Sequence, residues 1–438
     1  MNKLWILVVA ALLQACGGGG GGTTMAVSNN GGGTAAQCSI PDQQQHVLGF
    51  MQDEYYWYSQ MPAPNTAAAT MDAYFQSLLF RPTDRFSFSE STQAYQQLFD
   101  EGTFTGYGYT LTLTDAANMV LRVRIVEPNG PAMAAGMRRG DTIVSIDGFT
   151  PAQIVAGSVT SVGTEGVPRT IVVRDTAGST KTLQMVSATF PLKPVRDVAV
   201  LNGTRNGQPV KVGYLDYTQF VSYSRNDLVA AVSSFAAQGA SELVLDMRYN
   251  GGGDIDTSRD LASLIAGARL AGQVYASLRF NSKNQSQNQD YLFEAPAASM
   301  GTLPRIVIIA SANTASASEL VINGLKPFMD VVLVGSTTYG KPYGFVPYSY
   351  CGTTYNAVNF EVVNSAGVGG YTTGFTPTCA AADDLEHELG DPNEGELKTA
   401  LGYIATGSCP QSAQSASLVS KPARVLGDMT RPPGMFKK

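Results

Sequence analysis

The spacing of apolar residues changes along the chain and predicts regions of different secondary structure. Over residues 119–126, apolar positions alternate with positions that include Arg122 and Arg124. Such alternation is typical of a half-buried β-strand. Residues 171–173 and 183–185 are predicted to pair as strands across a polar turn. Short helices are predicted at 131–137 and after Thr150, a good N-cap that a proline follows.

Past Pro194 the pattern becomes a series of apolar runs with helical segments between them. Wholly apolar runs of this length are typical of strands that are buried on both faces. The predicted strands cover residues 210–217, 242–247, 305–310 and 331–334. Helices are predicted near residues 225–238 and 258–271 and directly after Ser316. Alternating strands and helices predict a layered α/β domain.

Residues 38 to about 100 show a third pattern, rich in aromatic side chains. Apolar and aromatic residues recur at roughly helical spacing over 43–59 and again over 71–80, and Pro62 to Asn65 separate the two stretches. We predict a small helical region that packs against a larger body.

The first 33 residues have the composition of an export signal and a linker. A short positive start and the apolar stretch Leu4 to Ala11, too short to span a bilayer, precede Leu13-Gln14-Ala15-Cys16. This sequence resembles the bacterial lipobox, which implies lipidation of Cys16, a membrane partner through the lipid anchor, and a location in the bacterial cell envelope, outer membrane or periplasm. An ordinary cleaved signal peptide is the alternative. Glycine-rich residues 17–33 predict a flexible tether.

Overall composition limits the class of protein. The 438 residues suffice for two or three domains. An apolar content of 44% with 15% charged residues is typical of a globular protein. The net charge of −6 gives no reason to expect a nucleic-acid partner.

Four cysteines remain once Cys16 is set aside. An even number of cysteines outside the cytosol favours two disulfides, for which three pairings exist. We favour Cys351–Cys379, which would close a local segment, together with Cys38–Cys409, which would join the two ends of the folded body. A zinc site is the alternative, but no C-x-x-C spacing supports it.

The apolar run 306–310 leads through small polar residues into a helical pattern that begins near Ser316. A serine at such a strand-to-helix turn lies near the unpaired N–H groups of the helix, which can stabilise an oxyanion. Ser316 is therefore a candidate nucleophile, although serine before a helix is often only a cap.

A nucleophilic serine needs a base, and the chain has two histidines, His46 and His387, both in polar surroundings. A buried lysine can act as the base if burial keeps it neutral. Lys341 follows the predicted strand 331–334 and a turn of small residues, which makes it the preferred candidate. We expect Lys326 to be a solvated charge instead.

A second glycine-rich turn follows the strand 242–247. Residues 251–253 are all glycine, so backbone N–H groups there can approach a ligand closely. A flexible connecting loop is the alternative. Asp246 and Arg248 at the end of this strand are expected to pair with each other or with a neighbour, which is a structural role.

Residues 102–190 resemble a PDZ domain. The resemblance rests on Gly106-Tyr107-Gly108-Tyr109 and on the run 130–141, which reads G-P-A-M-A-A-G-M-R-R-G-D. It implies that the Gly106–Tyr109 loop offers backbone N–H groups to a peptide carboxylate, and that the peptide adds as a strand beside the domain. A PDZ fold without a ligand is the alternative.

The serine turn, the glycine turn, the lysine and the PDZ-like region together resemble the carboxyl-terminal processing (tail-specific) peptidase family. Residues 314–319 (T-A-S-A-S-E) are similar to its nucleophile motif, residues 246–253 to its D-L-R-x-N-x-G-G turn, and Gly340-Lys341 to its G-K. The resemblance implies a crotonase-like layered α/β catalytic core with a preceding or inserted α+β PDZ domain and a small N-terminal helical region. It assigns Ser316 as nucleophile, Lys341 as general base, and the N–H groups of Ala317 and of Gly252 or Gly253 as oxyanion donors.

One position departs from the family pattern. The family often has a glutamine four residues after the lysine, where it helps to orient the lysine; here that position is Phe345. The serine and lysine themselves are retained, so another group is expected to orient Lys341.

The sequence thus predicts a lipid-anchored serine endopeptidase that cleaves polypeptides near accessible C-termini through an acyl-enzyme. The alternative is an inactive lipoprotein that binds peptides or apolar ligands on the same scaffold. No metal or organic cofactor is implied. The predicted divisions are a signal peptide (1–16), linker (17–36), helical region (37–100), PDZ domain (101–190), catalytic core (191–407) and a loosely ordered tail (408–438).

Overall fold

The computed structural model describes residues 38–296, 298–411, 425–427 and 434–437. The signal peptide, Cys16 and the linker lie outside the described residues. None of the helices in the described part of the chain has the length and apolar character that a membrane span requires.

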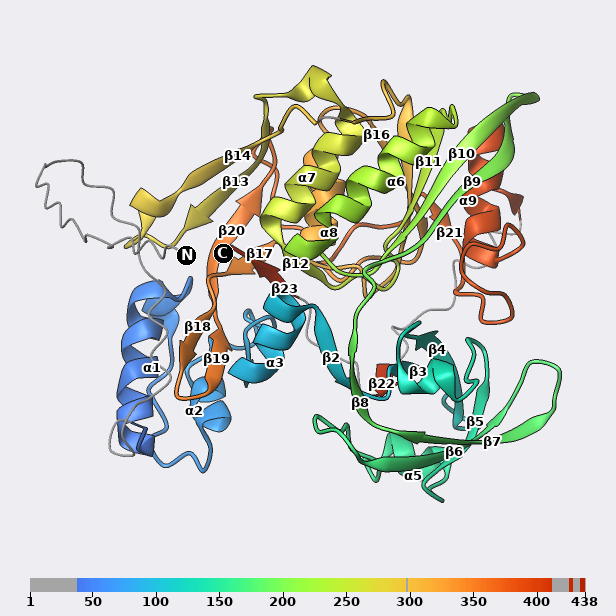
Figure 1. Ribbon diagram of the computed structural model, residues 1–438. Coiled ribbons are helices and arrows are strands. Elements are labelled where there is room, and N and C mark those ends of the chain that lie inside the picture. The colour runs from blue at the N-terminus through green and yellow to red at the C-terminus, as the bar shows by residue number, and fades with distance from the viewer. Residues whose placement is uncertain (1–37, 297, 412–424, 428–433, 438) are drawn as a thin grey trace, which may run out of the picture.

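The N-terminal region combines helices with a strand (Figure 1). Its elements are α1 (Ile40–Glu54), α2 (Met71–Ser77), β1 (Phe88–Ser91) and α3 (Thr92–Gln96). Ser39 caps α1 through a bond from the Asp42 N–H, and Val47 and Met51, four residues apart on one face, are fully buried. Strand β1 pairs with β19 (Thr353–Asn356), so this region is joined to the rest of the molecule through a sheet as well as through side-chain packing.

The PDZ region forms its own sheet and its own apolar core. Its elements are β2 (Thr103–Gly106), β3 (Tyr109–Asp115), β4 (Val120–Val126), α4 (Pro131–Ala134), β5 (Thr142–Ile146), α5 (Pro151–Val155), β6 (Pro168–Arg174), β7 (Thr180–Val186) and β8 (Ala188–Pro191). The predicted strand over 119–126 is confirmed as β4, and its alternation holds over 120–123, where Leu121 and Val123 are buried in this core. It does not hold elsewhere, because Met119 lies outside the strand and is exposed, and Arg124 is buried. The predicted hairpin is also confirmed, with Ile171 opposite Leu183. β2 pairs with β8, where the chain enters and leaves the region.

A six-stranded sheet in the described chain organises the largest region. Its spatial order is β21 (Cys379–Ala380), β16 (Asp330–Gly335), β15 (Arg305–Ala310), β11 (Glu242–Asp246), β10 (Gln208–Tyr217) and β9 (Val195–Arg205). The strands from β10 to β21 are parallel, and β9 pairs antiparallel with β10. The predicted strand 305–310 is therefore the centre of the sheet's parallel part.

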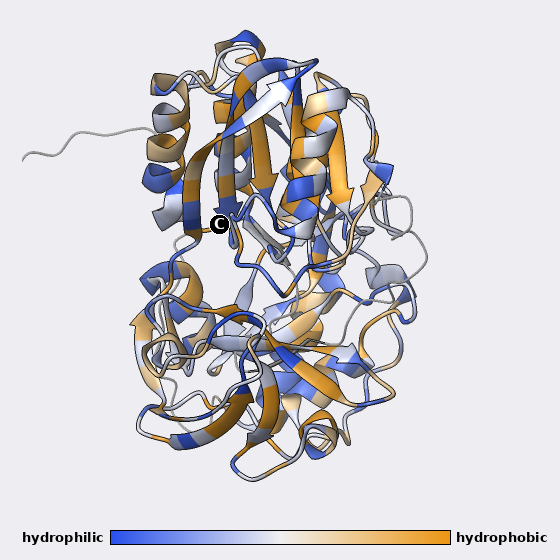
Figure 2. Cartoon of the chain, turned by 90° about the vertical axis from the view of Figure 1, so that its right-hand side faces the viewer, coloured by the Kyte–Doolittle hydropathy of each residue, from blue (hydrophilic) through white to orange (hydrophobic). Residues whose placement is uncertain are grey.

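Helices cover both faces of this sheet, which is why its strands are apolar throughout (Figures 1 and 2). One face packs against α6 (Arg225–Ala237), α7 (Ile255–Ala266) and α8 (Ala317–Leu325). The other packs against α9 (Gly395–Thr406), whose Leu397, Ala400 and Ile404 contact Val244, Val307 and Val332. The predicted layered α/β core is confirmed.

Smaller sheets adjoin the layered core. One has the order β12 (Gly252–Asp254), β23 (Gly434–Phe436), β17 (Tyr343–Phe345), β20 (Val358–Val363), β13 (Val274–Phe280) and β14 (Gln289–Leu292). Another joins β1, β19 and β18 (Tyr348–Tyr350). The remaining strand, β22 (Val425–Gly427), pairs with β3 of the PDZ region. The prediction of a loosely ordered tail after residue 407 is therefore wrong for residues 425–427 and 434–436, which lie in sheets.

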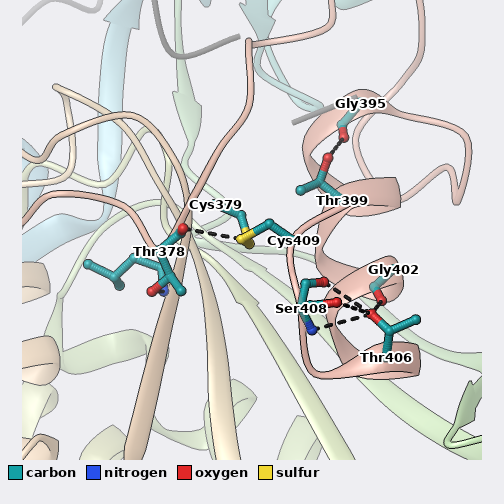
Figure 3. Close-up of a disulfide and its surroundings, with 9 residues drawn as sticks. Thr378, Cys379, Gly395, Thr399, Gly402, Thr406, Ser408 and Cys409 are labelled. Atoms are coloured by element: carbon teal, nitrogen blue, oxygen red, sulfur yellow. Dashed lines mark hydrogen bonds between the residues drawn. A yellow bond between two sulfur atoms is a disulfide. The ribbon is translucent and has the colours of Figure 1, made fainter. Parts of the chain in front are cut away.

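The predicted disulfide pairing is wrong. The structure joins Cys38 to Cys351 and Cys379 to Cys409. Cys351 lies in the turn between β18 and β19, which packs beside the start of α1, so its partner is in the N-terminal region. Cys379 lies at the edge of the main sheet, next to the end of α9, where Cys409 follows the helix (Figure 3). The expectation of two disulfides is confirmed.

Candidate active site

Ser316 lies where the central strand β15 turns into α8. Its side chain is fully buried, and its hydroxyl Oγ has no hydrogen-bond partner among the described residues. Its backbone has φ 60° and ψ −114°, in a region that residues other than glycine rarely adopt. Ser316 is the N-cap of α8 and forms a capping box with Glu319, so the feature that sets it apart from an ordinary cap is its strained backbone.

Glu319, one turn into α8, connects Ser316 to the segment that carries Lys341. Oε2 of its buried carboxylate accepts from the backbone N–H of Ser316 at 3.0 Å and from that of Lys341 at 2.8 Å. Oε1 accepts from the N–H of Gly340 at 2.7 Å and from the Thr338 hydroxyl at 2.5 Å. One carboxylate oxygen thus fixes the two candidate catalytic residues relative to each other. Burial raises the pKa of Glu319, and these four bonds act in the opposite direction.

Lys341 is fully buried in an apolar setting. Its Nζ lies 3.7 Å from the centroid of the Phe345 ring and 6.0 Å from that of Phe86. The position that departs from the family pattern therefore contacts the lysine directly, through an aromatic face in place of an amide. A lysine that acts as a base must be held in a buried site of this kind.

The turn before Lys341 is held from two sides. Arg85 of the N-terminal region donates from Nη2 to the carbonyl oxygens of Tyr339 and Gly340, at 2.9 and 3.1 Å. The Tyr339 N–H donates to the carbonyl of Thr314, at 3.0 Å, in the turn that carries Ser316. Gly340 has φ +85°, and a Cβ there would lie 2.4 Å from the Thr372 oxygen, so the turn requires glycine.

The serine turn is also bonded to the turn after β11. Thr314 Oγ1 donates to the Met247 carbonyl at 2.7 Å, and Ser318 Oγ donates to the Asn250 carbonyl at 3.0 Å. The N–H of Ala315 donates to the same Asn250 oxygen at 3.1 Å. Ser318 thus packs near the start of the helix, and the three predicted segments, 246–253, 314–319 and 340–341, are brought together in the structure.

The three candidate oxyanion donors differ in their surroundings. Ala317 is the first residue of α8, where helical N–H groups have no partner within the helix. The N–H of Gly252 donates to Asn250 Oδ1 at 2.9 Å, so it stabilises the turn and is already bonded. Gly253 has φ +135°, and a Cβ there would lie 1.9 Å from the Phe220 oxygen, which restricts the position to glycine. Ala317 and Gly253 are therefore the better-placed pair.

Asp246 and Arg248 pair as expected, with Arg248 Nη2 and Asp246 Oδ2 2.7 Å apart, and both side chains are buried. Glu394 and Glu396 of the α9 start complete the shell around the guanidinium, at 2.8 and 2.6 Å. Coulombic attraction to these carboxylates holds the pKa of Arg248 well above its usual value, although burial opposes it. Asp383, Glu394 and Glu396 lie close enough together to hold a metal ion, and all three pair with this guanidinium.

The same network reaches the PDZ region through Asp383. Asp383 contacts Arg248 Nη1 at 3.7 Å and bonds Arg139 Nη2 at 2.6 Å. Tyr249, which directly follows Arg248, receives a bond from Arg139 and donates to Asp383 at 2.6 Å. The turn beside the candidate oxyanion glycines is therefore linked to the PDZ region through Asp383 and Tyr249.

The predicted PDZ loop lies between β2 and β3. Tyr107 and Tyr109 are buried, and the carbonyls of Tyr107 and Gly108 accept from Ala132 and Glu127. Gly108 has φ +82°, which the loop's path requires. The loop directly precedes β3, the strand on which β22 pairs.

The other candidate bases make contacts elsewhere. His46 stacks on Tyr350, with ring centroids 4.2 Å apart. His387 bonds Asp384, and that hydrogen bond raises the pKa of the histidine. Lys326 is exposed, with Nζ 4.0 Å from the centroid of the Phe375 ring, and partial desolvation lowers its pKa. Sequence reasoning missed Glu319 and Arg85, since their bonds go to residues on other elements.

Comparison with protein families gives matches over most of the described chain. The sequence model of peptidase family S41 matches residues 211–364, that of the peptidase S41 N-terminal domain matches residues 42–88, and that of a PDZ domain matches residues 122–151. The first covers the main sheet, the serine turn and Lys341.

Curated relatives and a solved structure agree with these matches. The chain is 28% identical over 269 residues to a carboxyl-terminal-processing protease of Picosynechococcus, covering 60% of this chain and 58% of the relative. It is 30% identical over 247 residues to the chloroplastic carboxyl-terminal-processing peptidase 1 of Arabidopsis thaliana, covering 54% and 47%. The chain spans about half the length of the curated relatives it matches. The crystal structure of a putative S41 protease from Bacteroides fragilis aligns with a TM-score of 0.66 and 27% identity, covering 82% of this chain and 96% of that one.

Proposed function

Because the chain belongs to peptidase family S41, we propose that it is a serine endopeptidase that uses Ser316 as nucleophile and Lys341 as general base. The observation that carries the proposal is the shared Glu319 oxygen, which bonds the backbone of both residues while the Ser316 hydroxyl remains without a partner among the described residues. A structural serine would use its hydroxyl in a bond.

In the proposed reaction the neutral amine of Lys341 accepts the Ser316 hydroxyl proton as Oγ attacks the peptide carbonyl. The N–H groups of Ala317 and Gly253 donate to the oxyanion that forms. The protonated lysine then gives its proton to the leaving amine, which leaves an acyl-enzyme. Water, deprotonated by Lys341, attacks the ester and releases the carboxylate product together with free Ser316.

The proposed substrates are polypeptides with accessible C-termini. Relatives are named carboxyl-terminal-processing proteases, and the PDZ region presents the edge of β3 beside the Gly106–Tyr109 loop. Strand addition at this edge would hold a substrate's C-terminal segment through main-chain bonds. Residues 1–33 support a location in the bacterial envelope, with a lipid anchor at Cys16.

The test is cleavage of an unstructured polypeptide by protein that begins after the linker, compared with its Ser316→Ala and Lys341→Ala variants. We expect both variants to lose at least 10³-fold in kcat/KM, since each removes a partner of the proton transfer. Lys326→Ala is the control, an exposed lysine outside the site that should retain activity. Activity that survives in both site variants, with folding unchanged, would refute the dyad. No cleavage by the parent and its Ser316→Ala variant alike, with tight peptide binding by both, would favour a binding protein.

A further inference from the structure

The chain's own C-terminal segment occupies the peptide edge of the PDZ region. Strand β22 runs antiparallel to β3, with Val425 opposite Thr112, Leu426 opposite Leu111 and Gly427 opposite Thr110. β22 is the outermost strand of that sheet, on the side of β3 away from β4 (Figure 1). Strand addition at a sheet edge of this kind is how a PDZ domain binds a peptide, so a segment of this chain lies where a substrate would bind.

A second part of the same segment lies beside the candidate catalytic residues. Strand β23 separates β12 from β17 and pairs in parallel with both. β12 carries Gly252 and Gly253, and β17 begins two residues after Lys341. Without β23, these two strand edges would be open toward each other, and an extended polypeptide is the structure that fits between two open edges.

The register brings β23 against Gly253 in particular. Phe220 donates to the Gly252 carbonyl, and the Asp254 N–H donates to the Phe220 carbonyl, each at 2.9 Å. Because alternate residues of a strand present their N–H groups to opposite sides, the N–H of Gly253 faces the other side, where Met435 is its partner in register. The proposed oxyanion donor therefore lies against the docked segment.

The end of the segment is bonded to β17, on the side of β23 away from β12. The Lys437 N–H donates to the Phe345 carbonyl at 3.0 Å, and its Nζ lies 5.3 Å from the centroid of the Phe280 ring. Burial lowers the pKa of Lys437. These contacts place the last described residue of the chain on the strand that also contacts Lys341.

A cavity of about 430 Å³ lies beside the PDZ region and is lined also by residues of the N-terminal region. Its lining includes Thr110, which pairs with the last residue of β22, and Gln219, whose amide donates to the Gly252 carbonyl next to the first residue of β23. The cavity thus adjoins a residue that pairs with β22 and a residue that bonds the strand beside β23.

We propose that β22 and β23 are a tethered substrate mimic, which occupies the β3 edge of the PDZ region and the space between β12 and β17 and so holds the enzyme in a self-inhibited state. The inference rests on the proposed function. A tethered segment competes at an effective concentration in the millimolar range, which exceeds that of most free substrates. A substrate must displace it, so apparent activity falls by the fraction of molecules in which the segment is docked.

The test uses single proline substitutions in the full chain. Met435→Pro removes an N–H from β23, which pairs on both sides, and Leu426→Pro does the same in β22. Ser417→Pro is the control, at a position that precedes both segments in the sequence. If the segment is docked in about 90% of molecules, kcat/KM for an unstructured polypeptide rises about tenfold in Met435→Pro and stays unchanged in the control. Equal activity in parent, Met435→Pro and control would overturn the proposal.

A binding measurement separates this inference from the catalytic proposal. In a Ser316→Ala background, a fluorescent peptide with the sequence of residues 421–438 should bind the Met435→Pro chain about tenfold more tightly than the parent chain by anisotropy. That result with no cleavage by any variant would keep the mimic and reject the peptidase. Cleavage by the parent with equal peptide affinity in both chains would keep the peptidase and reject the mimic. Loss of the segment from the parent on incubation, but not from Ser316→Ala, would show a substrate in place of an inhibitor.

Discussion

Substitution of Glu319 by glutamine tests how the site is held together. The side chains have nearly the same shape, so the change removes the charge and one acceptor oxygen without leaving a cavity. Glu319 accepts four hydrogen bonds, two at each oxygen, from Ser316, Thr338, Gly340 and Lys341. If Oε2 becomes the amide nitrogen, the buried N–H groups of Ser316 and Lys341 both face another donor. If Oε1 does, only the Gly340 N–H does so, because the Thr338 hydroxyl can turn to accept.

The magnitude follows from this count. Each buried donor that loses its acceptor costs ~1–3 kcal/mol, so two cost ~2–6 kcal/mol of unfolding free energy. Part of this loss is offset, because burial raises the pKa of Glu319 and so already opposes its charged form. We expect a net destabilisation near the lower bound, about 2 kcal/mol.

The effect on activity is expected to be larger than the effect on stability. Oε2 is the shared partner of the Ser316 and Lys341 backbones, so its loss allows the nucleophile and base to move apart. A displacement of about 1 Å at reacting groups can reduce the rate about 10²-fold. The assay is kcat/KM for an unstructured polypeptide at a temperature where urea unfolding shows the variant to be folded.

Two further variants separate this mechanism from a general loss of stability. Thr338→Val removes one donor to Oε1 but leaves both backbone bonds to Oε2, so it should retain most of the activity. Glu294→Gln changes an exposed carboxylate that pairs with Arg259, and it should alter neither quantity. A folded Glu319→Gln protein with kcat/KM within about twofold of the parent would refute the positioning role.

Three further predictions concern the base, a buried carboxyl group and a disulfide. Phe345→Ala removes a buried ring that contacts Lys341 and should lower the free energy of unfolding in urea by ~3–5 kcal/mol. Phe345→Gln should have a similar stability but retain more activity than Phe345→Ala. Burial raises the pKa of Asp216 to about 7, so the native state binds this proton more tightly than the unfolded state. Stability should therefore fall, by at most about 4 kcal/mol, as pH rises from about 4 to 7, and Asp216→Asn should flatten this slope in urea unfolding at pH 5 and 8. Replacing Cys379 and Cys409 together by serine should lower the free energy of unfolding by ~3–4 kcal/mol, from a cross-link with a sequence separation of 30 residues, and unchanged urea midpoints would contradict it.

The sequence predicted the parts of the fold that depend on local patterns. Residues 305–310 were predicted as a buried strand and form β15 with the same bounds, because an apolar run of that length has few other stable environments. The alternation over 119–126 likewise predicted β4, whose Leu121 and Val123 are buried. Both signals arise within one element and need no knowledge of its neighbours.

Features that depend on which elements meet were not predictable in this way. The preferred pairing of Cys351 with Cys379 assumed that neighbours in sequence are neighbours in space, whereas Cys351 pairs with Cys38, 313 residues away in sequence. Glu319 stood within the quoted nucleophile motif, yet its role depends on residues 338–341, which another strand positions. The donors that bond a carboxylate can be identified only when the fold is known, because they can come from other elements.

The C-terminal segment illustrates a more general reason why composition misleads. Its residues are rich in Ser, Ala and Pro, which predicted a loose tail, but strand addition is driven by main-chain N–H and C=O groups that almost every residue has. An edge such as β3 can therefore hold a sequence with little β propensity, provided that the segment is already close. The covalent connection to the rest of the chain supplies that proximity. A free peptide of residues 421–438 should therefore inhibit the parent only weakly, while the same residues in the chain inhibit strongly. Strong inhibition of the parent by the free peptide at micromolar concentration would show that side chains, and not the tether, provide the affinity.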